Sequence, residues 1–414
     1  MSKNNDNFFA KKKIWSEVKD ELLAYYLVPY FNKILRTGKP ILYVDCFAGK
    51  GKFDDGKPGS PLMAIKSLET SLGQYHGNRA APPVTMKFIE LNHSKDLEAN
   101  IPEPQLGMCE VITGRFQDQI APLITKAVST HPSQNVFFYI DPYGVKVLNA
   151  ALLDQIANAF TTAELLINLN SFGFIREACR VKNVQFRESE DDIFGDLEEY
   201  DYSALKSINE LNAIAGGDYW QQIIEAYQAK KINCYEAEKE FSLRYKERLR
   251  EKYKYVLDMP IRLKPGHHPK YRMVHATNHP DGCVLMAENI AKRTDRLVVE
   301  VQGGGQGTLF SETADNEYAS DNELTQKVKS ILDETTEFTR LNTFLANFYN
   351  KYGVLCDVSR LTTGKGGSIL KSLEKSGYVD IQRDPATTLN GSSSTFWGEH
   401  GKQTIQLRKR AREK

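Results

Sequence analysis

Cysteine is scarce in this sequence, and its spacing excludes several kinds of site. Six cysteines are spread over 414 residues without a C-x-x-C pair: Cys46, Cys109, Cys179, Cys234, Cys283 and Cys356. Zinc sites and redox motifs need cysteines at short spacing, so neither is predicted. The histidines do not replace them, because the pair His267 and His268 falls in a Pro-Gly turn between two predicted strands, where a metal role is the minor alternative. We predict no metal site and a reduced, cytoplasmic protein.

The sequence also lacks an excess of either charge and lacks long apolar runs. It has 54 Lys and Arg against 53 Asp and Glu, a net charge of +1. A nucleic-acid partner therefore needs a local basic patch. Mean hydropathy is −0.46, and no run of about 18 apolar residues occurs, so we expect no membrane partner. Residues 1–13 are polar and then basic, without the apolar centre of a secretory signal.

Short apolar runs that alternate with helical stretches predict the fold class. The runs are Ile41–Val44, Met86–Ile89, Val111–Ile112, Val136–Ile140 and Leu165–Leu169. Strands this apolar are buried on both faces, which is typical of a mostly parallel sheet with helices on each side. A helix over residues 14–35 precedes them, with Ile14, Val18, Leu22 and Tyr25 on one face. We predict an open α/β fold with a Rossmann-like sheet.

Composition divides the chain into a large domain, a linker and a smaller domain. Residues 1–300 form the predicted α/β domain, which carries a charged helical insertion at about residues 176–250. The insertion is either a solvated helical region or a lid or platform for a substrate. Two strands near residues 255–263 and 271–277 are expected to pair as a hairpin. Residues 301–321 are glycine-rich and then acidic, as in linkers.

Residues 322–414 predict a winged-helix-like α+β domain. Three helices are expected at residues 324–332, 341–352 and 368–375. A β-ribbon over Ile381–Phe396 would follow, turning at Asn390-Gly391. Residues 351–414 carry 12 basic and 6 acidic side chains, which is the electrostatic pattern of nucleic-acid binding. The alternative is a winged helix that binds only protein.

The first chemical motif is a glycine turn directly after the first strand. Asp45 ends the strand and Phe47, Ala48, Gly49 and Gly51 follow. Glycine permits backbone conformations and a close ligand approach that a side chain would block. Rossmann-like methyltransferases hold S-adenosylmethionine in this way, with its methionine part across the turn. The dinucleotide fingerprint and the P-loop are not met, because the third glycine and the Gly-Lys-Ser/Thr sequence are absent.

Two further residues are candidates for the same cofactor site. Glu90 ends the second strand, where a carboxylate can accept both hydroxyls of a ribose. The alternative is a soluble strand end, and its distance from Gly51 along the chain exceeds the common spacing. After the third strand, where methyltransferases often have an acid, this sequence has Phe116, which we expect to stack on adenine.

A third motif, Asp141-Pro142-Tyr143-Gly144, follows the fourth strand. Methyltransferases that act on exocyclic amines have Asp/Asn-Pro-Pro-Tyr at this place. Asp141 would accept a hydrogen bond from the amine, and Tyr143 would stack on the base beside Pro142. The alternative is an Asp-Pro turn that caps the next helix.

Together these motifs resemble the three-Cys-motif partner family (TcmP) over roughly residues 10–300. The matching segments are Val44–Gly51, Pro58–Leu62, Phe88–Glu90 and Ile140–Gly144, with Trp15 and Lys19 at the family's opening. The order is also similar to that of ribosomal RNA adenine methyltransferases of the RlmJ type. The resemblance implies that Asp45, Gly49 and Gly51 hold S-adenosylmethionine, that Ser60 lines its pocket and that Asp141 faces the target amine. It also implies a neighbouring protein with three clustered cysteines as a partner.

Two functions from different classes follow from these patterns. The leading hypothesis is an S-adenosylmethionine-dependent methyltransferase that acts on nucleic acid, with an exocyclic amine of a base as acceptor. The second is a non-catalytic partner, binding nucleic acid or cofactor, of the three-cysteine protein. A nuclease gains no support, because carboxylates at metal-binding spacing are not evident.

Overall fold

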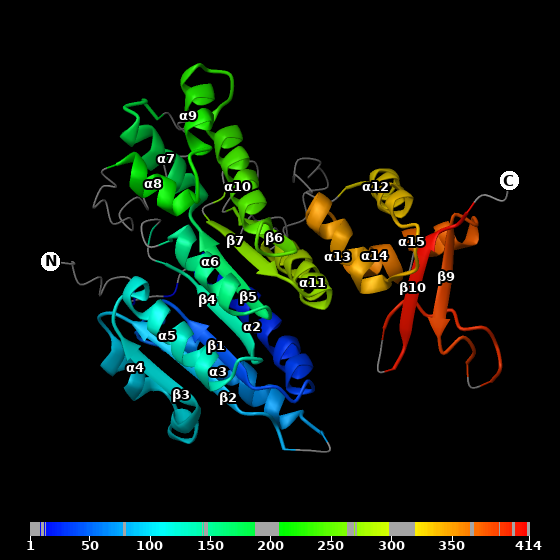
Figure 1. Cartoon of the computed structure of the whole chain (residues 1–414), viewed down its shortest axis with the longest axis horizontal. Helices are drawn as coiled ribbons and strands as arrows, with labels where there is room; N and C mark the ends of the chain where they lie inside the picture. Colours follow the sequence, from blue (N-terminus) through cyan, green and yellow to red (C-terminus); the bar gives the residue numbers. More distant parts are fainter. Residues whose placement is uncertain are drawn as a thin grey trace.

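A seven-stranded sheet and a smaller C-terminal unit make up the computed structural model (Figure 1). The structure describes residues 9, 12, 14–77, 80–142, 144, 148–186, 207–262, 269, 271–297, 319–364, 368–388, 390–399 and 402–411. Among these residues, no helix combines the length and the apolar character needed to cross a bilayer. They also contain no group of three or more His, Cys, Asp and Glu side chains that could hold a metal ion.

The strands of the large sheet follow the order β3-β2-β1-β4-β5-β7-β6. They are β1 Ile41–Asp45, β2 Val84–Glu90, β3 Cys109–Thr113, β4 Asn135–Ile140, β5 Ala163–Leu169, β6 Tyr255–Ile261 and β7 Tyr271–Thr277. All neighbours are parallel except β7, which is antiparallel to both β5 and β6. This is the strand order of the Rossmann-like methyltransferase sheet, so the predicted fold class is confirmed. Each of the five apolar runs lies in one of the strands β1 to β5.

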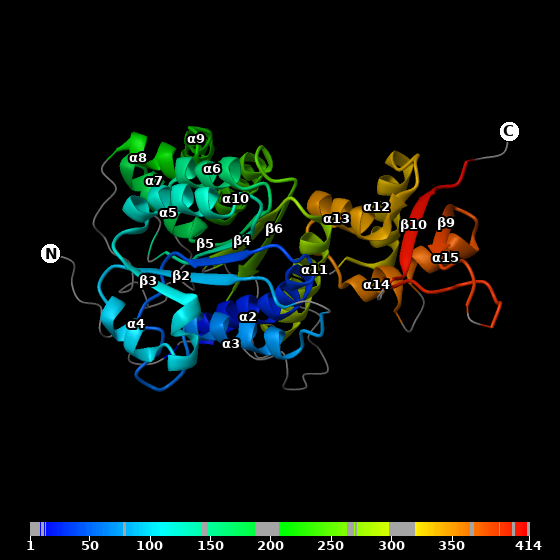
Figure 2. The ribbon, with the colours of Figure 1, turned by 60° about the horizontal axis from the view of Figure 1, so that its bottom comes forward.

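Helices cover both faces of this sheet, which explains why β1 is buried along its whole length (Figure 2). They are α2 Ile14–Leu35, α3 Ser60–Gly73, α4 Ser94–Asn100, η1 Glu103–Met108, α5 Phe116–Thr130, α6 Ala150–Ala159, α7 Ser171–Val181, α8 Ile208–Ala215, α9 Trp220–Gln228, α10 Cys234–Arg250 and α11 Pro280–Arg296. Alternate residues of β1 enter different cores: Tyr43 belongs to the core that includes α2, α3 and α11, whereas Val44 belongs to the core that includes α5 to α10.

The helix over residues 14–35 has the predicted bounds, and Val18 and Leu22 of its predicted face are buried, but Tyr25 is not. Tyr25 is 57% exposed, whereas Tyr26 is fully buried. The Arg293 guanidinium on α11 lies 4.1 Å from the centre of the Tyr25 ring, so an arginine covers the tyrosine that we expected in the core. The prediction for Tyr25 was wrong because it placed the next buried residue three positions after Leu22. The buried face continues four positions after Leu22, at Tyr26.

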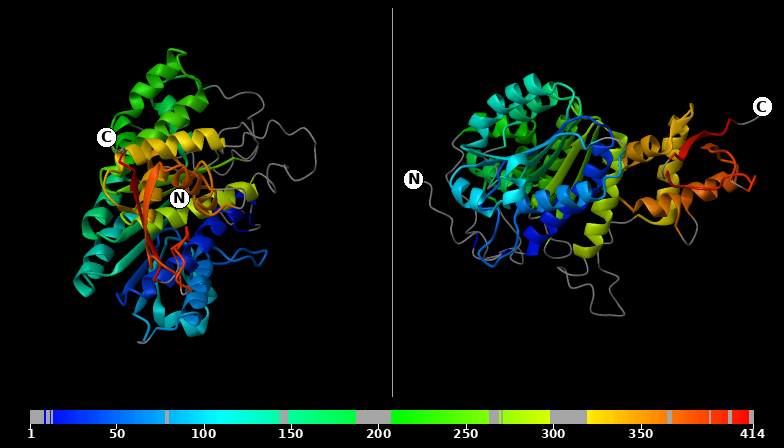
Figure 3. Two further views of the ribbon diagram at one scale, coloured as in Figure 1. Left: turned by 90° about the vertical axis from the view of Figure 1, so that its right-hand side faces the viewer. Right: turned by 90° about the horizontal axis from the view of Figure 1, so that it is seen from below.

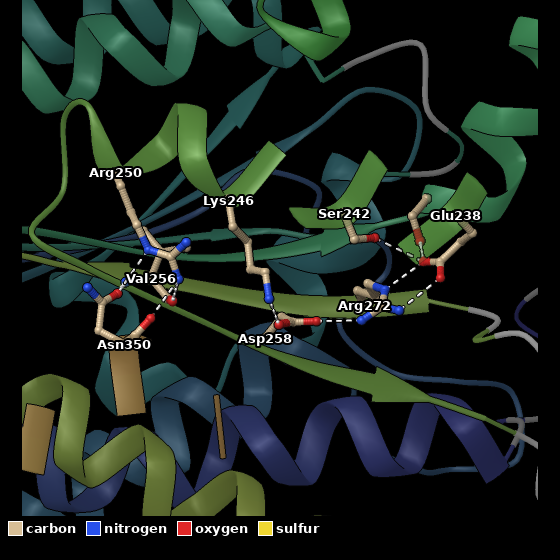
Figure 4. A network of polar contacts seen from close by, with 9 residues as sticks. Glu238, Ser242, Lys246, Arg250, Val256, Asp258, Arg272 and Asn350 are labelled. Carbon is tan, nitrogen blue, oxygen red and sulfur yellow. Dashed lines mark hydrogen bonds and ion pairs between the residues drawn. The ribbon is translucent and has the colours of Figure 1, made fainter. Parts of the chain in front are cut away.

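The helical insertion is tied to the sheet by a buried ion network (Figure 4). Arg272 on β7 donates to Glu238 on α10 at 2.5 and 2.8 Å and to Asp258 on β6 at 2.7 Å. Lys246 on α10 also binds Asp258. Burial raises the pKa of Asp258, but the two neighbouring cations outweigh it and hold that pKa below its ordinary value. The network fixes α10 on the sheet, which argues against a lid that moves through this helix and leaves open whether the insertion contacts a substrate.

The C-terminal unit has the elements α12 Asp321–Glu334, β8 Thr339–Arg340, α13 Leu341–Tyr352, α14 Val358–Thr362, α15 Ile369–Lys375, β9 Val379–Asp384 and β10 Thr404–Lys409. Its strands form an antiparallel sheet in the order β8-β10-β9. The three predicted helices correspond to α12, α13 and α15, and α14 is an additional short helix. Most of the predicted linker, residues 301–318, lies outside the described residues, and its last residue, Asp321, begins α12.

The predicted β-ribbon is wrong in its second strand. β9 pairs with β10, with Asp384 opposite Thr404, and not with residues up to Phe396. Asn390-Gly391 does lie in a small turn, closed by a bridge between Thr387 and Ser393. The loop between β9 and β10 is longer than predicted because most side chains that directly follow Pro385 are small and polar. Residues 404–409 instead alternate apolar and polar side chains, with Ile405 and Leu407 buried.

The C-terminal unit packs through α13 against α11 and against β6 of the large sheet (Figures 3 and 4). Arg250 at the end of α10 donates to the backbone oxygen of Asn350 at 2.9 Å and to its side-chain oxygen at 3.1 Å. The side-chain oxygen of Asn350 also accepts a hydrogen bond from the backbone N–H of Val256 at 2.9 Å. Val256 belongs to β6, the edge strand of the sheet. Asn350 therefore occupies hydrogen-bonding positions of an edge that would otherwise be open to pairing.

A candidate cofactor and substrate site

Three acidic side chains meet at one edge of the large sheet. Asp45 ends β1, Glu90 ends β2, and Asp141 directly follows β4. In the parallel register Asp45 is level with Phe88 and with Tyr139, so Glu90 and Asp141 each stand two residues beyond it. Ligands of open α/β sheets bind outside the carboxyl ends of the strands, where the strand order reverses. β1 lies at this reversal, so the predicted residues come together where a ligand is expected.

Asp45 is fully buried and is held from two sides. Ser60, the first residue of α3, donates its hydroxyl to Oδ2 of Asp45 at 2.6 Å, and the backbone N–H of Phe47 donates to Oδ1 at 3.2 Å. Burial raises the pKa of Asp45 to about 7, although these two hydrogen bonds favour the ionised form. The predicted residues Asp45 and Ser60 are therefore in direct contact, and both belong to the wall behind the glycine turn.

The glycine turn needs glycine for a steric reason. Gly49 and Gly51 have φ angles of 63° and 77°, a region that residues with a Cβ rarely adopt. A Cβ on Gly51 would also lie 2.7 Å from Cδ1 of Leu97 on α4. The Gly51 backbone oxygen accepts from the N–H of Gly59 at 2.8 Å. The loop before α3 thereby supports the turn, which explains why the two motifs occur together.

Glu90 fixes the same turn from the neighbouring strand. Its Oε2 accepts from the backbone N–H of Gly49 at 2.8 Å. Its Oε1 accepts from the backbone N–H groups of Asn92 and His93 at 2.9 and 3.1 Å. A carboxylate has about four acceptor positions, so these bonds leave about one for a ligand. Glu90 can accept a hydrogen bond from one ribose hydroxyl and keep its three bonds to the backbone. Accepting from both hydroxyls, as predicted, requires the loss of one of those backbone bonds.

The remaining predicted cofactor residues surround the turn with apolar surface. Ala48 is buried and donates its N–H to the Ile89 oxygen at 3.0 Å. Phe116, the first residue of α5, is buried with its ring 5.4 Å from the ring of Phe47. Contact of Phe116 with an adenine therefore stays a prediction.

Asp141 is part of a polar cluster that the motif did not reveal. Lys19 Nζ on α2 lies 3.0 Å from Oδ1 of Asp141 and 2.9 Å from Oδ2. Asn168 Nδ2 on β5 donates to Oδ1 at 2.6 Å, and the Tyr139 hydroxyl donates to Oδ2 at 3.1 Å. These four contacts occupy both oxygens. The Asp141 side chain is 22% exposed, so it still borders solvent.

Pro142 and Tyr143, the other two candidate residues of the third motif, have different outcomes. Pro142 is buried, and its place beside a substrate base stays a prediction. Tyr143 lies outside the described residues, so its stacking role stays a prediction.

The sequence did not predict that the three partners of Asp141 belong to the site. Lys19 entered only through the family resemblance, and Asn168 and Tyr139 were taken as strand residues. Asn168 offered one signal, because it is a polar residue at the carboxyl end of a strand in which all seven residues are buried. Lys19 offered none, since its contact with Asp141 spans 122 positions of the chain.

A second buried ion pair adds to the charge of this region. Asp20, next to Lys19 on α2, binds Lys12 Nζ at 2.5 Å. Burial raises the pKa of Asp20 despite this partner, and repulsion from Asp141 adds to the rise. With Asp45 ionised, three carboxylates face two ammonium groups. The cluster then has a net negative charge, which suits a cationic ligand.

Comparison with known proteins yields distant structural similarity only. No protein family matches the sequence, and no curated protein matches it. A Legionella pneumophila protein of the family DUF519 has 14% identity and a TM-score of 0.38, over 69% of this chain and 93% of that one. Human methyltransferase-like protein 13, solved with SAH, has 11% identity and a TM-score of 0.32, over 72% and 98%. A loganic acid methyltransferase with SAH has 11% identity and a TM-score of 0.29, over 73% and 87%.

Proposed function

We propose that this protein is an S-adenosylmethionine-dependent methyltransferase that acts on nucleic acid, with an exocyclic amine of a base as the methyl acceptor. The observation that supports it most is the meeting of the glycine turn, Glu90 and Asp141 at one edge of the sheet, on the order of strands found in methyltransferases. Composition and fold alone do not specify an activity, so the proposal depends on this arrangement of side chains.

The residues present fit the proposed cofactor. S-adenosylmethionine carries a sulfonium and an ammonium group, and the cluster around Asp45, Asp20 and Asp141 has net negative charge when Asp45 is ionised. Gly49 and Gly51 hold the turn against which the methionine part would lie, and Glu90 has an acceptor position left for a ribose hydroxyl. When bound, the cofactor supplies an electrophilic methyl group. The chain supplies position and alignment for the attacking amine.

We propose that residues 322–414 form a winged-helix-like domain that contacts nucleic acid through α15. Much of the basic charge counted in the sequence is paired: Arg410 binds Asp380 at 2.6 Å, and Lys409 binds Asp333 at 2.7 Å. Among the described residues, Lys371 and Lys375 on α15 are exposed and have no acidic partner. α15 is therefore a better candidate for phosphate contact than β10.

The double variant Lys371→Glu with Lys375→Glu is expected to weaken nucleic-acid binding. Loss of two phosphate contacts lowers the slope of log affinity against log salt by about two, since each contact contributes about 0.9 on a duplex. Binding of the full chain to a 20-base-pair DNA or RNA duplex, measured by fluorescence anisotropy at several salt concentrations, gives this slope.

A matched control makes the same change of charge elsewhere. Lys66→Glu with Lys126→Glu alters two lysines that are 78% and 68% exposed on α3 and α5. The control is expected to keep the salt slope of the wild type. Equal slopes for both double variants would remove α15 from the interface.

The activity itself is tested by transfer of a labelled methyl group. The full chain and labelled S-adenosylmethionine are incubated with unmodified RNA, unmodified DNA and a protein extract treated with nucleases. The proposal expects label in nucleic acid, recovered after digestion as a base with a methylated exocyclic amine. Label in the protein extract alone would contradict the nucleic-acid substrate.

One observation favours a second candidate, a non-catalytic partner of a three-cysteine protein that binds cofactor or nucleic acid. The Asp141 carboxylate, the expected acceptor for an amine, is already occupied by Lys19, Asn168 and Tyr139. Binding of S-adenosylmethionine without methyl transfer to any of these materials would support this candidate.

A further inference from the structure

The acceptor positions of Asp141 are filled by protein groups. Lys19 contacts both carboxylate oxygens, Asn168 donates to Oδ1, and Tyr139 donates to Oδ2. Because a carboxylate has about four acceptor positions, a substrate amine could bind Asp141 only by displacing one of these donors. The group that receives the amine must therefore be sought beside Asp141.

Asn168 has the complementary property, an acceptor without a donor among the residues that the structure describes. The residue is 4% exposed, and no described group donates a hydrogen bond to its buried Oδ1. Its orientation is fixed, because Nδ2 donates to Asp141 at 2.6 Å and a flipped amide would face oxygen with oxygen. A buried carbonyl oxygen without a donor costs free energy, and such an atom in a folded protein calls for a function or a bound molecule.

The place of Asn168 connects this acceptor to the site. Its neighbour Ile167 on β5 is level with Ile140 on β4, so Asn168 is level with Asp141 at the carboxyl edge. Asp141 borders solvent, and Oδ1 of Asn168 belongs to the same planar amide whose nitrogen touches Asp141. A ligand that reaches Asp141 therefore lies next to this amide, and it contacts the buried Oδ1 once the groups that cover the oxygen move aside.

We propose that the side-chain oxygen of Asn168 accepts a hydrogen bond from the amine of the methyl-accepting base, while Asp141 and Lys19 hold the amide in position. This inference rests on the proposed function and names the residue that recognises its substrate. An amide oxygen accepts one N–H and offers nothing to a carbonyl at the same position. The site then distinguishes a base with an exocyclic amine from the corresponding base with a carbonyl.

The test measures nucleotide binding to the full chain saturated with S-adenosylhomocysteine, so that the cofactor site is filled. The probes are two pairs that differ in the exocyclic group: adenosine and inosine monophosphates, and cytidine and uridine monophosphates. In at least one pair the amine-bearing nucleotide is expected to bind about tenfold more tightly. Asn168→Leu, which removes the acceptor, is expected to abolish this preference.

Two further variants separate recognition from support of Asp141. Asn168→Asp keeps an acceptor oxygen and loses the donor to Asp141, and it is expected to retain a preference for the amine. Tyr139→Phe removes a different donor to Asp141 and leaves Asn168 intact, so it is also expected to retain the preference.

Each contrary result has a definite meaning. The inference is overturned if Asn168→Leu keeps the preference, if Tyr139→Phe loses it to the same extent, or if the wild type shows none, as when a buried water satisfies Oδ1. Binding of S-adenosylhomocysteine is measured first for every protein. Failure of the wild type to bind it would refute the proposed function, whereas normal binding without a preference refutes only the role of Asn168.

Discussion

Replacing Asp141 with alanine is expected to lower methyl transfer by about 100-fold to 10,000-fold with little change in affinity for S-adenosylmethionine. The carboxylate holds the Lys19 ammonium and fixes the Asn168 amide. Without it, the acceptor for the amine loses its orientation and a buried cation loses its partner. The cofactor contacts of the glycine turn and Glu90 are separate from these bonds. Methyl transfer and cofactor titration, measured on the same preparation, test the two halves of this expectation.

Two controls keep this result specific. Asp118→Ala removes an exposed acid from the first turn of α5 and is expected to retain activity. The double variant Lys19→Met with Asp141→Ala removes the stranded cation, so its stability is expected to recover while activity stays low. Normal turnover in Asp141→Ala would contradict the assignment of the third motif to the reaction.

Replacing Arg272 with methionine is expected to lower the free energy of unfolding by about 3–5 kcal/mol. Methionine leaves the carboxylates of Glu238 and Asp258 buried, and within the described residues Glu238 then keeps only the hydroxyl donors of Ser171 and Ser242. Loss of one partner from a buried ion pair costs more than the pair contributed, because the remaining charge stays out of water. Chemical denaturation, followed by circular dichroism, measures the difference.

The comparison variant is Arg244→Met on the outer face of α10. Arg244 pairs with Glu240 and Glu247, and all three side chains are exposed. Exposed pairs contribute about 0–1 kcal/mol, so this variant is expected to unfold almost like the wild type. A similar small effect for Arg272→Met would show that the network does not fix the insertion on the sheet.

The sequence was sufficient for the parts of the fold that depend on local pattern. Each of Asp45, Glu90 and Asp141 comes at the end of an apolar strand, and parallel strands bring their carboxyl ends to one edge. The place of the three acids was therefore predictable before the structure. The second strand of the C-terminal ribbon was not predictable in this way. Asn390-Gly391 is typical of a hairpin turn, but here it forms only a small turn within the longer loop between β9 and β10.

The site's polar partners depend on contacts between distant parts of the chain. Lys19 reaches Asp141 because α2 packs on the face of the sheet to which Tyr139 also points. Asn168 reaches it because β5 lies beside β4 in register. Neither spacing nor residue type along the chain contains this information, and so sequence reasoning found the motif acid but not the groups that occupy it.

The most direct test of the account is a calorimetric titration of the full chain with S-adenosylmethionine, beside the double variant Asp45→Ala with Glu90→Ala. We expect binding in the low-micromolar range, about −8 kcal/mol, for the wild type and loss of binding in the variant, because these side chains hold the glycine turn. Absence of binding to the wild type, or unchanged binding in the double variant, would contradict the assignment of this edge of the sheet to the cofactor.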